Sequence, residues 1–394
     1  MAGKRDRLSG NEAIAIALRQ INPDVFPAFP ITPSTEIPQY FASFVANGQV
    51  DTEFIPVESE HSSMSAAIGA SAAGARSLTA TSSCGLAYMW EELYIAASNR
   101  LPLALALVNR ALSGPININC DHSDSMGARD AGWIQIYAEN NQEAYDNMVQ
   151  AFRISEHKDV RLPIMICQDG FITSHAVENI ELLEDKEVKN FVGEYEPEEF
   201  LLNPGKPIAV GPYSITDYYM EAKRNQAEGT RNVSRVVKEV AEEFEKLSGR
   251  KYGLFEEYRM DDAEYVIVIM GSAAGTTKEA VDELREQGIK AGMIKVRVFR
   301  PFPGAELAAA LENAKGIAIM DRAESFSGCG GPLGSELKAA LYDAKNESTT
   351  VNYFYGLAGR DYTVETACGI YQDLIDYVSG KQEAEQFKYI GLRK

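Results

Sequence analysis

Short apolar runs alternate with amphipathic segments along the first 180 residues of the chain. The runs at residues 24–29, 52–58, 77–83, 101–109 and 161–168 are predicted strands, because short apolar runs bounded by turn residues are typical of strands. The run at 101–109 is apolar almost throughout, as in parallel strands covered on both faces. Helices are predicted at residues 9–20, after Thr35, and at residues 61–77 and 86–99. Strands that alternate with helices predict an α/β fold.

Two predicted helices have clear starting signals. The sequence Ser-Gly-Asn-Glu at residues 9–12 is a capping box. Thr35 is the predicted N-cap of the next helix, because that choice places Pro38 in the first turn, where its missing N–H is not needed. A cap at Thr32 would place Pro38 deeper, where a hydrogen bond would be lost. Thr32 is therefore expected in the preceding turn with a free hydroxyl, held in place by the neighbouring prolines.

The pattern changes near residue 180 and again near residue 260. Residues 181–258 are acidic and weakly periodic, apart from an amphipathic helix at residues 231–249 that ends at Gly249. A second α/β unit follows, with predicted strands at residues 264–272, 291–299, 316–321 and 350–357 and helices at 276–288 and 304–314. We therefore expect an α/β domain at residues 1–180, a connector with one packed helix at 181–258, and a second α/β domain at 259–394.

Composition narrows the classes of function. The 394 residues are 45% hydrophobic, which is enough for an ordinary core, and carry a net charge of −19, which argues against a nucleic-acid partner. The apolar run at residues 13–18 is about half the length of a signal-peptide core and is followed by Arg19. No stretch approaches the ~20 apolar residues of a membrane span. We expect a soluble cytoplasmic protein without a membrane partner.

Cysteine and histidine spacing argues against a metal centre in this chain. The five cysteines are far apart and form no CxxC pair, and the four histidines are scattered. Neither a structural zinc site nor a cysteine-ligated iron–sulfur cluster is therefore expected.

Candidate catalytic side chains follow the predicted strands. Glu58 and Glu60 lie between a strand and a helix, at the edge where ligands bind in open α/β sheets and where a helix dipole favours an ionised carboxylate. They are either helix-capping acids or include a catalytic carboxylate that faces a cofactor ring. Arg110 directly follows the strand at 101–109 and either clamps a substrate carboxylate or pairs with an acid of the protein.

The residues around these candidates leave further alternatives. The long polar loop at residues 113–129 has the character of a lid. Within it, Asp121, His122 and Asp124 are either metal ligands or, as is more common, residues whose hydrogen bonds order the loop. Cys84 is expected to be a small core cysteine, because no base lies nearby in the sequence to activate it. The glycine-rich segment at residues 326–336 lacks a known phosphate-binding pattern and is expected to allow close packing instead.

In order along the chain, eight segments together resemble one family. They are FPITPST, VESEHS, GASAAGAR, NRALSGPININCDHSDSM, RDAGWIQIYAEN, DGFITSH, VRVFRPFP and GLAGRD. This series resembles the α subunit of 2-oxoacid:ferredoxin oxidoreductases, most closely those that oxidise pyruvate, and the resemblance covers nearly the whole chain.

The resemblance implies a fold and an activity. The fold is a thiamine-diphosphate pyrimidine-binding domain followed by a transketolase C-terminal-like domain. The activity is oxidative decarboxylation of pyruvate with coenzyme A to acetyl-CoA and CO₂, with electrons passed to ferredoxin. Rival interpretations are an oxidoreductase for branched-chain or aryl 2-oxoacids, a transketolase-type transferase subunit, and a scaffold subunit without activity. Retention of Thr32, Glu60 and Arg110 argues against the scaffold.

Site residues carry over from the resemblance one by one. The family's YPITP turn matches residues 29–33, with Phe29 in place of tyrosine. This match implies that Thr32 contacts the substrate and that Pro30 and Ile31 line the cofactor site. Glu60 matches the glutamate that binds N1′ of the aminopyrimidine and promotes loss of the proton from thiazolium C2.

The substrate-binding part of the match contains departures. Arg110 matches an arginine that binds the carboxylate or keto oxygen of the substrate, and Asp121 matches a mobile loop beside it. Asn119 and Cys120 replace a tryptophan-containing pair in that loop, and Cys84 stands where relatives often carry glutamine. These departures are expected to alter the shape of the substrate pocket.

Missing motifs imply partner subunits. The family's diphosphate–Mg²⁺ motif, GDG with a downstream asparagine, is absent from this sequence, and so is any CxxCxxC cluster motif. The resemblance therefore implies a β subunit that supplies the diphosphate–Mg²⁺ half of the site, with γ and δ subunits and 4Fe-4S clusters outside this chain. By itself this chain is expected to be inactive.

Overall fold

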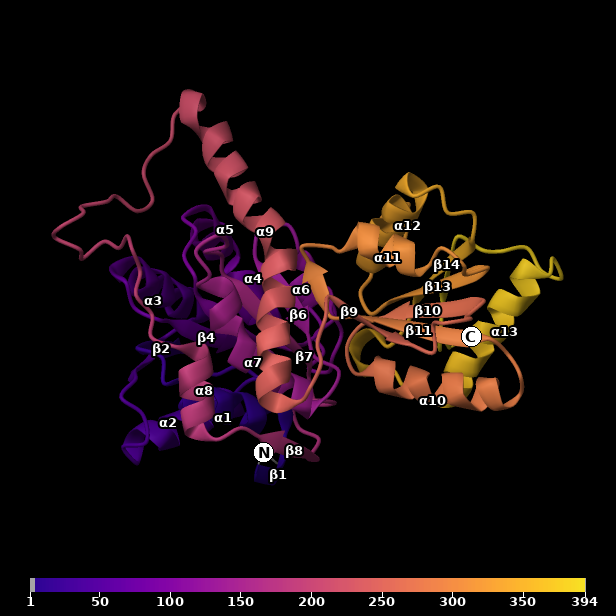
Figure 1. The fold of residues 1–394 in the computed structure, drawn as a ribbon, viewed down its shortest axis with the longest axis horizontal. Coiled ribbons are helices and arrows are strands. Elements are labelled where there is room, and N and C mark those ends of the chain that lie inside the picture. The colour runs from indigo at the N-terminus through magenta and orange to yellow at the C-terminus, as the bar shows by residue number, and fades with distance from the viewer. Residues whose placement is uncertain (1–3, 394) are drawn as a thin grey trace.

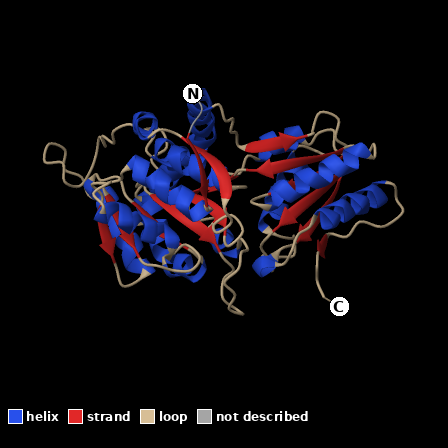
Figure 2. Ribbon diagram, turned by 90° about the horizontal axis from the view of Figure 1, so that it is seen from below, coloured by secondary structure: helices blue, strands red, loops and turns tan. Residues whose placement is uncertain are grey.

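Two α/β lobes lie side by side in the computed structural model, which describes residues 4–393 (Figure 1). The first lobe runs from Lys4 to the long helix α9, and the second holds the rest of the described chain except for one short strand. Helices lie on both faces of each sheet (Figure 2). The predicted alternation of strands and helices is confirmed in both lobes.

The first lobe is built on a largely parallel sheet. Its strand order is β12-β6-β7-β5-β4, in which all neighbours are parallel except the edge strand β12. Strands β2 and β3 form a separate parallel pair, and Val25 of β2 bridges to Ser77 beside β4. The bounds are β2 (Val25–Ala28), β3 (Glu53–Pro56), β4 (Leu78–Thr81), β5 (Ala104–Asn109), β6 (Ile134–Tyr137) and β7 (Ile164–Asp169). All predicted strands of this lobe are present, while β6 and the ribbon of β1 (Lys4–Leu8) with β8 (Glu178–Leu182) were not predicted.

The first two helices begin where the sequence predicts, but only the first of them has a side-chain cap. In α1 (Gly10–Ile21), the Ser9 hydroxyl accepts the Glu12 N–H at 3.2 Å and the Glu12 carboxylate accepts the Ser9 N–H at 2.8 Å. Helix α2 (Glu36–Ala46) begins after Thr35, as predicted, with Pro38 in its first turn. Thr35 makes no capping hydrogen bond, because its backbone is already helical (φ −52°, ψ −36°) and lacks the extended conformation of a side-chain cap.

The predicted helix at 86–99 is in fact two helices. Helix α4 (Ser83–Tyr88) and helix α5 (Trp90–Ser98) meet at Met89, whose backbone leaves the helical region (φ −87°, ψ 6°). The Met89 side chain is fully buried. The apolar pattern therefore continues across the junction although the hydrogen-bonded helix does not. Helix α3 (Glu60–Ala73) precedes this pair.

The sequence pattern did not reveal α7 (Asn141–Ser155), the most buried helix of the lobe. Its polar side chains Asp146, Asn147 and Gln150 are fully buried. Asp146 accepts hydrogen bonds from Arg250 at 2.6 Å and from Tyr252 at 2.6 Å, which lie about a hundred residues further along the chain. Buried polar groups need such partners, and in this helix they hide the amphipathic periodicity.

Helix α9 (Thr216–Ser248) begins 15 residues before the helix predicted at 231–249, and it ends at Gly249 as predicted (φ 74°). Its C-terminal half buries valines and Phe244 in the same core as α7. Its N-terminal half projects from the lobe and exposes Tyr218, Tyr219 and Met220 (Figure 1). That half carries no apolar stripe against this chain, so periodicity could not mark its start. None of the described helices, α9 included, combines the length and apolar character needed to cross a bilayer.

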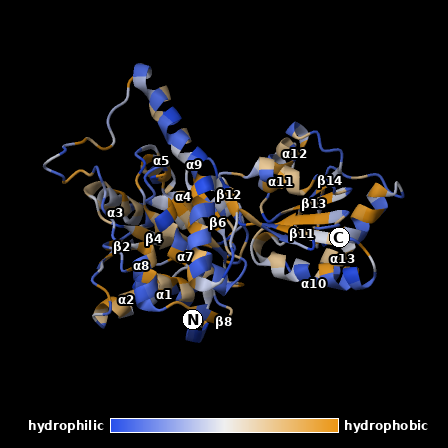
Figure 3. Ribbon diagram, viewed as in Figure 1, coloured by the Kyte–Doolittle hydropathy of each residue, from blue (hydrophilic) through white to orange (hydrophobic). Residues whose placement is uncertain are grey.

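The second lobe holds a six-stranded sheet in the order β15-β14-β13-β10-β11-β9, parallel except for β9. Its central strands are strongly hydrophobic (Figure 3). The strands are β9 (Phe255–Tyr258), β10 (Tyr265–Ile269), β11 (Ala291–Val296), β13 (Gly316–Asp321), β14 (Thr349–Phe354) and β15 (Phe387–Tyr389). The helices are α10 (Ala273–Glu286), α11 (Gly304–Ala310), α12 (Pro332–Asp343) and α13 (Val364–Val378).

One predicted strand is divided between the two lobes. The run at 291–299 forms β11 in the second lobe and then, after Arg297, β12 (Val298–Arg300), which pairs antiparallel with β6 at the edge of the first sheet. The buried Arg297 guanidinium donates to Asn147 Oδ1 at 2.9 Å and to the Gly253 carbonyl at 3.0 Å. Beside it, the buried Lys295 ammonium pairs with Glu139 of the first lobe at 2.6 Å. The lobes are thus joined by backbone pairing and by buried charge.

Candidate functional site

The turn after β2 exposes the residues predicted to meet a substrate and cofactor. Pro30 and Thr32 are exposed and Ile31 is half-buried. The backbone behind them is fixed, because the Asn11 amide donates to the Pro33 carbonyl at 2.9 Å and the Ser34 N–H donates to the Ile31 carbonyl at 2.9 Å. The turn therefore presents its outer residues on a rigid support.

Arg110 contacts this turn directly. Its Nη1 donates to the Thr32 carbonyl at 2.9 Å and its Nε donates to the Asn117 carbonyl at 3.2 Å. The side chain is largely buried, with 7% of the residue exposed. These guanidinium hydrogen bonds go to neutral carbonyl oxygens and leave the positive charge without a carboxylate partner among the described residues. A buried cation in this state suits an anionic ligand.

Glu60 is the first residue of α3 and is only 8% exposed. It packs against Gly85, where a Cβ atom would lie 2.8 Å from Glu60 Cγ and 2.9 Å from Oε1. The same Cβ would lie 2.3 Å from Thr81 Oγ1, and that hydroxyl and Ser82 Oγ are buried without a hydrogen-bond partner among the described residues. Gly85 has no side chain and so leaves space beside the Glu60 carboxylate, and two hydroxyls nearby lack hydrogen-bond partners within the described part of the chain. This surrounding fits a heteroaromatic ring, because such a ring brings its own hydrogen-bonding groups.

Substitution of Gly85 by alanine is expected to disturb this pocket. The added methyl group would meet Thr81 and the Glu60 stem at distances that force one of them to move, with a cost of about 1–3 kcal/mol. A lower thermal unfolding midpoint would be measured, together with weaker binding of the thiamine diphosphate that the sequence resemblance implies. Gly69→Ala is the matched control, because an alanine there meets no atom within 4 Å and improves helix propensity in α3. An unchanged midpoint and unchanged binding for Gly85→Ala would contradict the packing argument.

Glu58 differs from Glu60 in its exposure and in its hydrogen-bond partner. It is exposed and accepts a hydrogen bond from the Ser62 hydroxyl. That hydrogen bond lowers the pKa of the Glu58 carboxyl. Glu58 therefore behaves as a surface acid beside the start of the helix, whereas Glu60 is buried at that start.

Cys84 is not a core cysteine, and that prediction was wrong. It lies half-buried in the first turn of α4, which begins earlier than predicted, and its Sγ is 2.9 Å from the Ser113 hydroxyl. The hydrogen bond from Ser113 lowers the pKa of the thiol against the effect of burial, and the nearby Arg110 charge acts in the same direction. Cys84 thus joins the α4 turn to the loop at residues 113–129.

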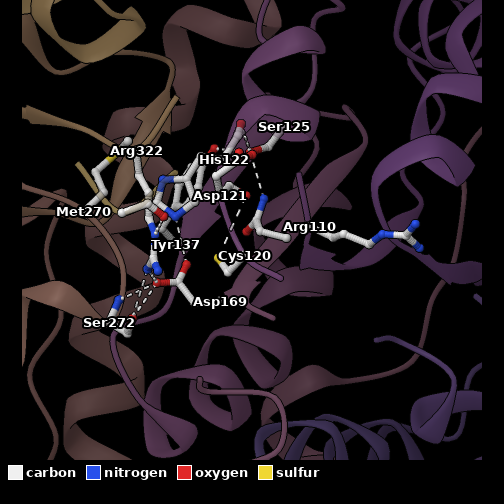
Figure 4. A network of polar contacts seen from close by, with 12 residues as sticks. Arg110, Cys120, Asp121, His122, Ser125, Tyr137, Asp169, Met270, Ser272 and Arg322 are labelled. Atoms are coloured by element: carbon white, nitrogen blue, oxygen red, sulfur yellow. Dashed lines mark hydrogen bonds and ion pairs between the residues drawn. The ribbon is translucent and has the colours of Figure 1, made fainter. Parts of the chain in front are cut away.

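That loop is attached to the second lobe at the predicted substrate-loop residues. The Gly359 N–H donates to the Cys120 carbonyl at 2.7 Å, and the Ala358 N–H donates to Asp121 Oδ2 at 3.3 Å. Asn119 is exposed, whereas Cys120 is buried and burial raises the pKa of its thiol. Arg110 points away from Cys120 and Asp121 (Figure 4). The structure therefore places Asn119, Cys120 and Asp121 at the junction of the lobes and the guanidinium on another side of the loop.

A buried network at the junction was not predicted from the sequence. His122 Nε2 lies 2.8 Å from Asp169 Oδ1, and Asp169 Oδ2 accepts from Arg322 at 2.8 Å and from the Ser272 hydroxyl at 2.6 Å (Figure 4). Although burial opposes it, the His122 ring and the Arg322 guanidinium hold the pKa of Asp169 well below its usual range. Single residues at distant positions gave no sequence signal for this network.

Three side chains of the junction have metal-ligand chemistry but already have other partners. Ligand atoms of Cys120, His122 and Asp169 lie within 4.8 Å of one another. Both oxygens of Asp169 accept hydrogen bonds, one of them from the Arg322 guanidinium. A fixed cation beside the carboxylate opposes a second cation there. We assign the group a structural role in joining the lobes.

The glycine-rich segment before α12 packs closely, in agreement with the expectation from its sequence. A Cβ on Gly331 would lie 2.3 Å from Asp321 Cγ. The Asp321 carboxylate accepts the N–H groups of Leu333 and Gly334 at 2.8 Å each. This acid therefore occupies the helix N-terminus that a phosphate would need.

A cavity of about 650 Å³ opens where the two lobes meet. The first lobe contributes Ser113, Asp121 and Ser123 to its lining, and the second contributes Glu324 and Phe326. Ser113 is also the partner of Cys84. One residue of the cavity wall therefore contacts the α4 turn.

Comparison with known families gives two matches that together cover most of the chain. Residues 16–242 match the family described as pyruvate flavodoxin/ferredoxin oxidoreductase, thiamine diP-bdg. Residues 263–367 match pyruvate:ferredoxin oxidoreductase core domain II.

Curated relatives match over nearly their whole length. Pyruvate synthase subunit PorA of Thermotoga maritima is 53% identical, and the alignment covers 99% of each chain. Pyruvate synthase subunit PorA of Methanocaldococcus jannaschii is 44% identical over 98% of each chain. Ketoisovalerate oxidoreductase subunit VorA of Pyrococcus abyssi is also 44% identical, over 96% of this chain and 95% of the relative.

Solved structures agree on the fold. A 2-oxoglutarate:ferredoxin oxidoreductase from Magnetococcus marinus matches with a TM-score of 0.74 at 20% identity, over 95% of this chain and 66% of that longer chain. A split-gene transketolase matches with a TM-score of 0.54 at 12% identity, over 94% of this chain and 99% of that chain. Together with the family matches, these likenesses confirm the predicted fold of two successive α/β units.

Proposed function

We propose that this chain, which belongs to the pyruvate flavodoxin/ferredoxin oxidoreductase family, is the α subunit of a pyruvate:ferredoxin oxidoreductase that acts in the cytoplasm. The assembly converts pyruvate, coenzyme A and two oxidised ferredoxins into acetyl-CoA, CO₂, two reduced ferredoxins and one proton. The observation that carries the proposal is the buried Arg110 guanidinium, which is held against the Thr32 turn and has no carboxylate partner among residues 4–393. The five free cysteines accord with a reducing compartment.

Glu60 is the residue that we assign to the cofactor. Thiamine diphosphate, when bound, supplies the acidic carbon that adds to the keto group of a 2-oxoacid. The Glu60 carboxylate holds a proton at N1′ of the aminopyrimidine, and its burial beside Gly85 excludes water from that hydrogen bond. Pro30 and Ile31 line the same site from the β2 turn.

Arg110 and Thr32 are the residues that we assign to the substrate. The guanidinium of Arg110 binds the carboxylate or keto oxygen of the 2-oxoacid, where its planar fork suits two oxygens. Thr32 places its hydroxyl beside the reacting carbon from the turn that Arg110 supports. Asn119, Cys120 and Asp121 border the access route from the junction of the lobes.

The proposed domain division places the pyrimidine-binding domain at residues 1–180, the connector at 181–258 and the transketolase C-terminal-like domain at 259–394. The C-terminal half of α9, within the connector, packs on α7. The connector therefore contributes to the core of the first lobe in addition to linking the domains.

The chain works only within an assembly, because its sequence lacks the diphosphate–Mg²⁺ motif and any cluster motif. A β subunit supplies the diphosphate and Mg²⁺ ligands opposite Glu60. The γ and δ subunits complete the assembly, and 4Fe-4S clusters in partner subunits pass the electrons singly to ferredoxin. Exposed aromatic side chains near the start of α3, Tyr88 and Trp90, offer apolar contact area on this side of the lobe.

The first experiment measures anaerobic viologen reduction by the assembly co-purified with this chain. Coenzyme A, thiamine diphosphate and Mg²⁺ are supplied, and pyruvate, 2-oxobutyrate, 2-oxoisovalerate, 2-oxoglutarate and oxalate are compared. We expect the highest kcat/KM with pyruvate and no turnover by the isolated chain. A preference for 2-oxoisovalerate would instead support the alternative suggested by the ketoisovalerate relatives. No turnover of any acid by the complete assembly would contradict the proposed function.

A further inference from the structure

The buried carboxylate of Asp124 connects three segments of the site. Its Oδ2 accepts the backbone N–H of Ser83 and the backbone N–H of Arg110, each at 3.0 Å. Its Oδ1 accepts the Asn109 side-chain amide at 2.8 Å and the Ser125 N–H at 2.7 Å. The α4 turn, the end of β5 and the loop at residues 113–129 therefore meet at one side chain that is 3% exposed.

The α4 turn that Asp124 holds has an unusual backbone. Ser83 adopts the left-handed conformation (φ 46°), which a residue with a Cβ atom rarely takes. Its hydroxyl donates to the Ala111 carbonyl at 2.5 Å, directly after Arg110. Strained residues of this kind persist where the surrounding contacts fix them. Ser83 is thus attached to the segment that carries Arg110 directly through its hydroxyl and indirectly through its N–H, which shares Asp124 Oδ2 with the Arg110 N–H.

The backbone at Arg110 is fixed from both sides. Asp124 holds its N–H, and the Asn119 carbonyl accepts the N–H of the following residue, Ala111, at 3.0 Å. From this fixed backbone the side chain of Arg110 reaches the Thr32 carbonyl. A shift of the backbone at Arg110 would therefore move the guanidinium away from the turn.

We propose that Asp124 is a positioning residue for the substrate-binding arginine: its carboxylate locks the backbone of Arg110 to the α4 turn and so fixes where the guanidinium meets the substrate. This inference rests on the proposed function, since it gives Arg110 the substrate-binding role.

The chemistry of the four donors requires a carboxylate. All four partners are N–H groups, and an ionised carboxylate offers only acceptors. Burial raises the pKa of Asp124 to about 6, which leaves the group ionised at neutral pH. An asparagine of the same shape would turn its NH₂ group toward two of the four N–H donors in either orientation. Asp124→Asn therefore breaks the lock with almost no change in volume.

A double-mutant cycle in the assembled complex tests the proposal. We expect Asp124→Asn to lower kcat/KM for pyruvate about tenfold or more, mainly through a higher KM, because the arginine is displaced while the reacting groups remain. In an Arg110→Ala background the same change is expected to have less than about a twofold effect, since residues that act through one another are not additive. Asp130→Asn, an exposed change of the same type nearby, is the matched control. Additive losses in the double variant would overturn the proposal.

Amide hydrogen exchange provides a second test that does not need turnover. We expect the amides of Ser83 and Arg110 to exchange faster in Asp124→Asn than in the parent assembly, and not in Asp130→Asn. Unchanged protection of both amides would overturn the inferred lock. If the parent assembly turns over no 2-oxoacid, the proposed function fails, and the exchange result still decides whether Asp124 holds these two backbone groups.

Discussion

Replacement of Glu60 by glutamine is expected to lower pyruvate oxidation by the assembled enzyme about 10²–10⁴-fold, the range typical for loss of a group that handles a proton in catalysis. The amide keeps the size of the side chain and its position against Gly85. It cannot hold an additional proton at N1′, so the cofactor would bind without being activated. We therefore expect the loss in kcat and only a modest change in the concentration of thiamine diphosphate needed for half-saturation.

Glu58→Gln provides the matched control for this experiment. The two glutamates lie two positions apart and carry the same charge, but Glu58 is exposed and bonded to Ser62. Both variants are assayed by viologen reduction at saturating pyruvate and coenzyme A. Full activity of Glu60→Gln, or an equal loss in both variants, would contradict the role assigned to Glu60.

Replacement of Arg110 by alanine is expected to lower kcat/KM for pyruvate by about 10²-fold or more, because it removes the charge-assisted hydrogen bonds that we propose Arg110 makes to the substrate. The change also removes the hydrogen bond to the Thr32 carbonyl, so part of the loss reflects the turn itself. Arg110→Lys separates the two causes. Lysine keeps the positive charge but lacks the planar fork, and we expect it to recover only a minor part of the lost kcat/KM.

The Arg110 variants can be recognised by which kinetic constants change and which stay the same. A substrate-binding arginine affects KM for pyruvate strongly, while the half-saturating concentrations of thiamine diphosphate and coenzyme A stay near their parent values. Arg235→Ala, which removes an exposed arginine on α9, controls for the loss of one positive charge. Parent-like pyruvate kinetics in Arg110→Ala would eliminate it as the substrate-binding residue.

The sequence predicted the parts of the fold whose signal is local. Continuous apolar runs such as residues 101–109 became buried parallel strands, and the capping box at Ser9 started α1 as predicted. Helix α7 was missed because its buried Asp146 and Asn147 accept hydrogen bonds from Arg250 and Arg297, which lie about a hundred residues away or more. No local pattern reveals a partner at that distance.

The site divides in the same way. Glu60 and Arg110 stand at strand ends, where position alone suggests chemistry, and the structure gives both of them low exposure and suitable neighbours. Cys84 was assigned to the core because its sequence neighbours contain no base, yet its partner Ser113 comes from the loop after the next strand. Asp124 accepts four hydrogen bonds because three segments of the chain meet at its carboxylate. The sequence could show only that an acid was present.

The pairing of β12, which follows a strand of the second lobe, with the sheet of the first lobe has a consequence for synthesis of the chain. During synthesis β6 leaves the ribosome about 160 residues before its edge partner, since residue 136 pairs with residue 298. Until then the first lobe carries an open strand edge, which is prone to pairing with other chains. At that stage Arg250 and Arg297, which donate hydrogen bonds to the buried polar side chains of α7, have not yet been synthesised. The first lobe therefore reaches its final form only after the second has begun to emerge, and the nascent chain depends on protection of that edge in the interval.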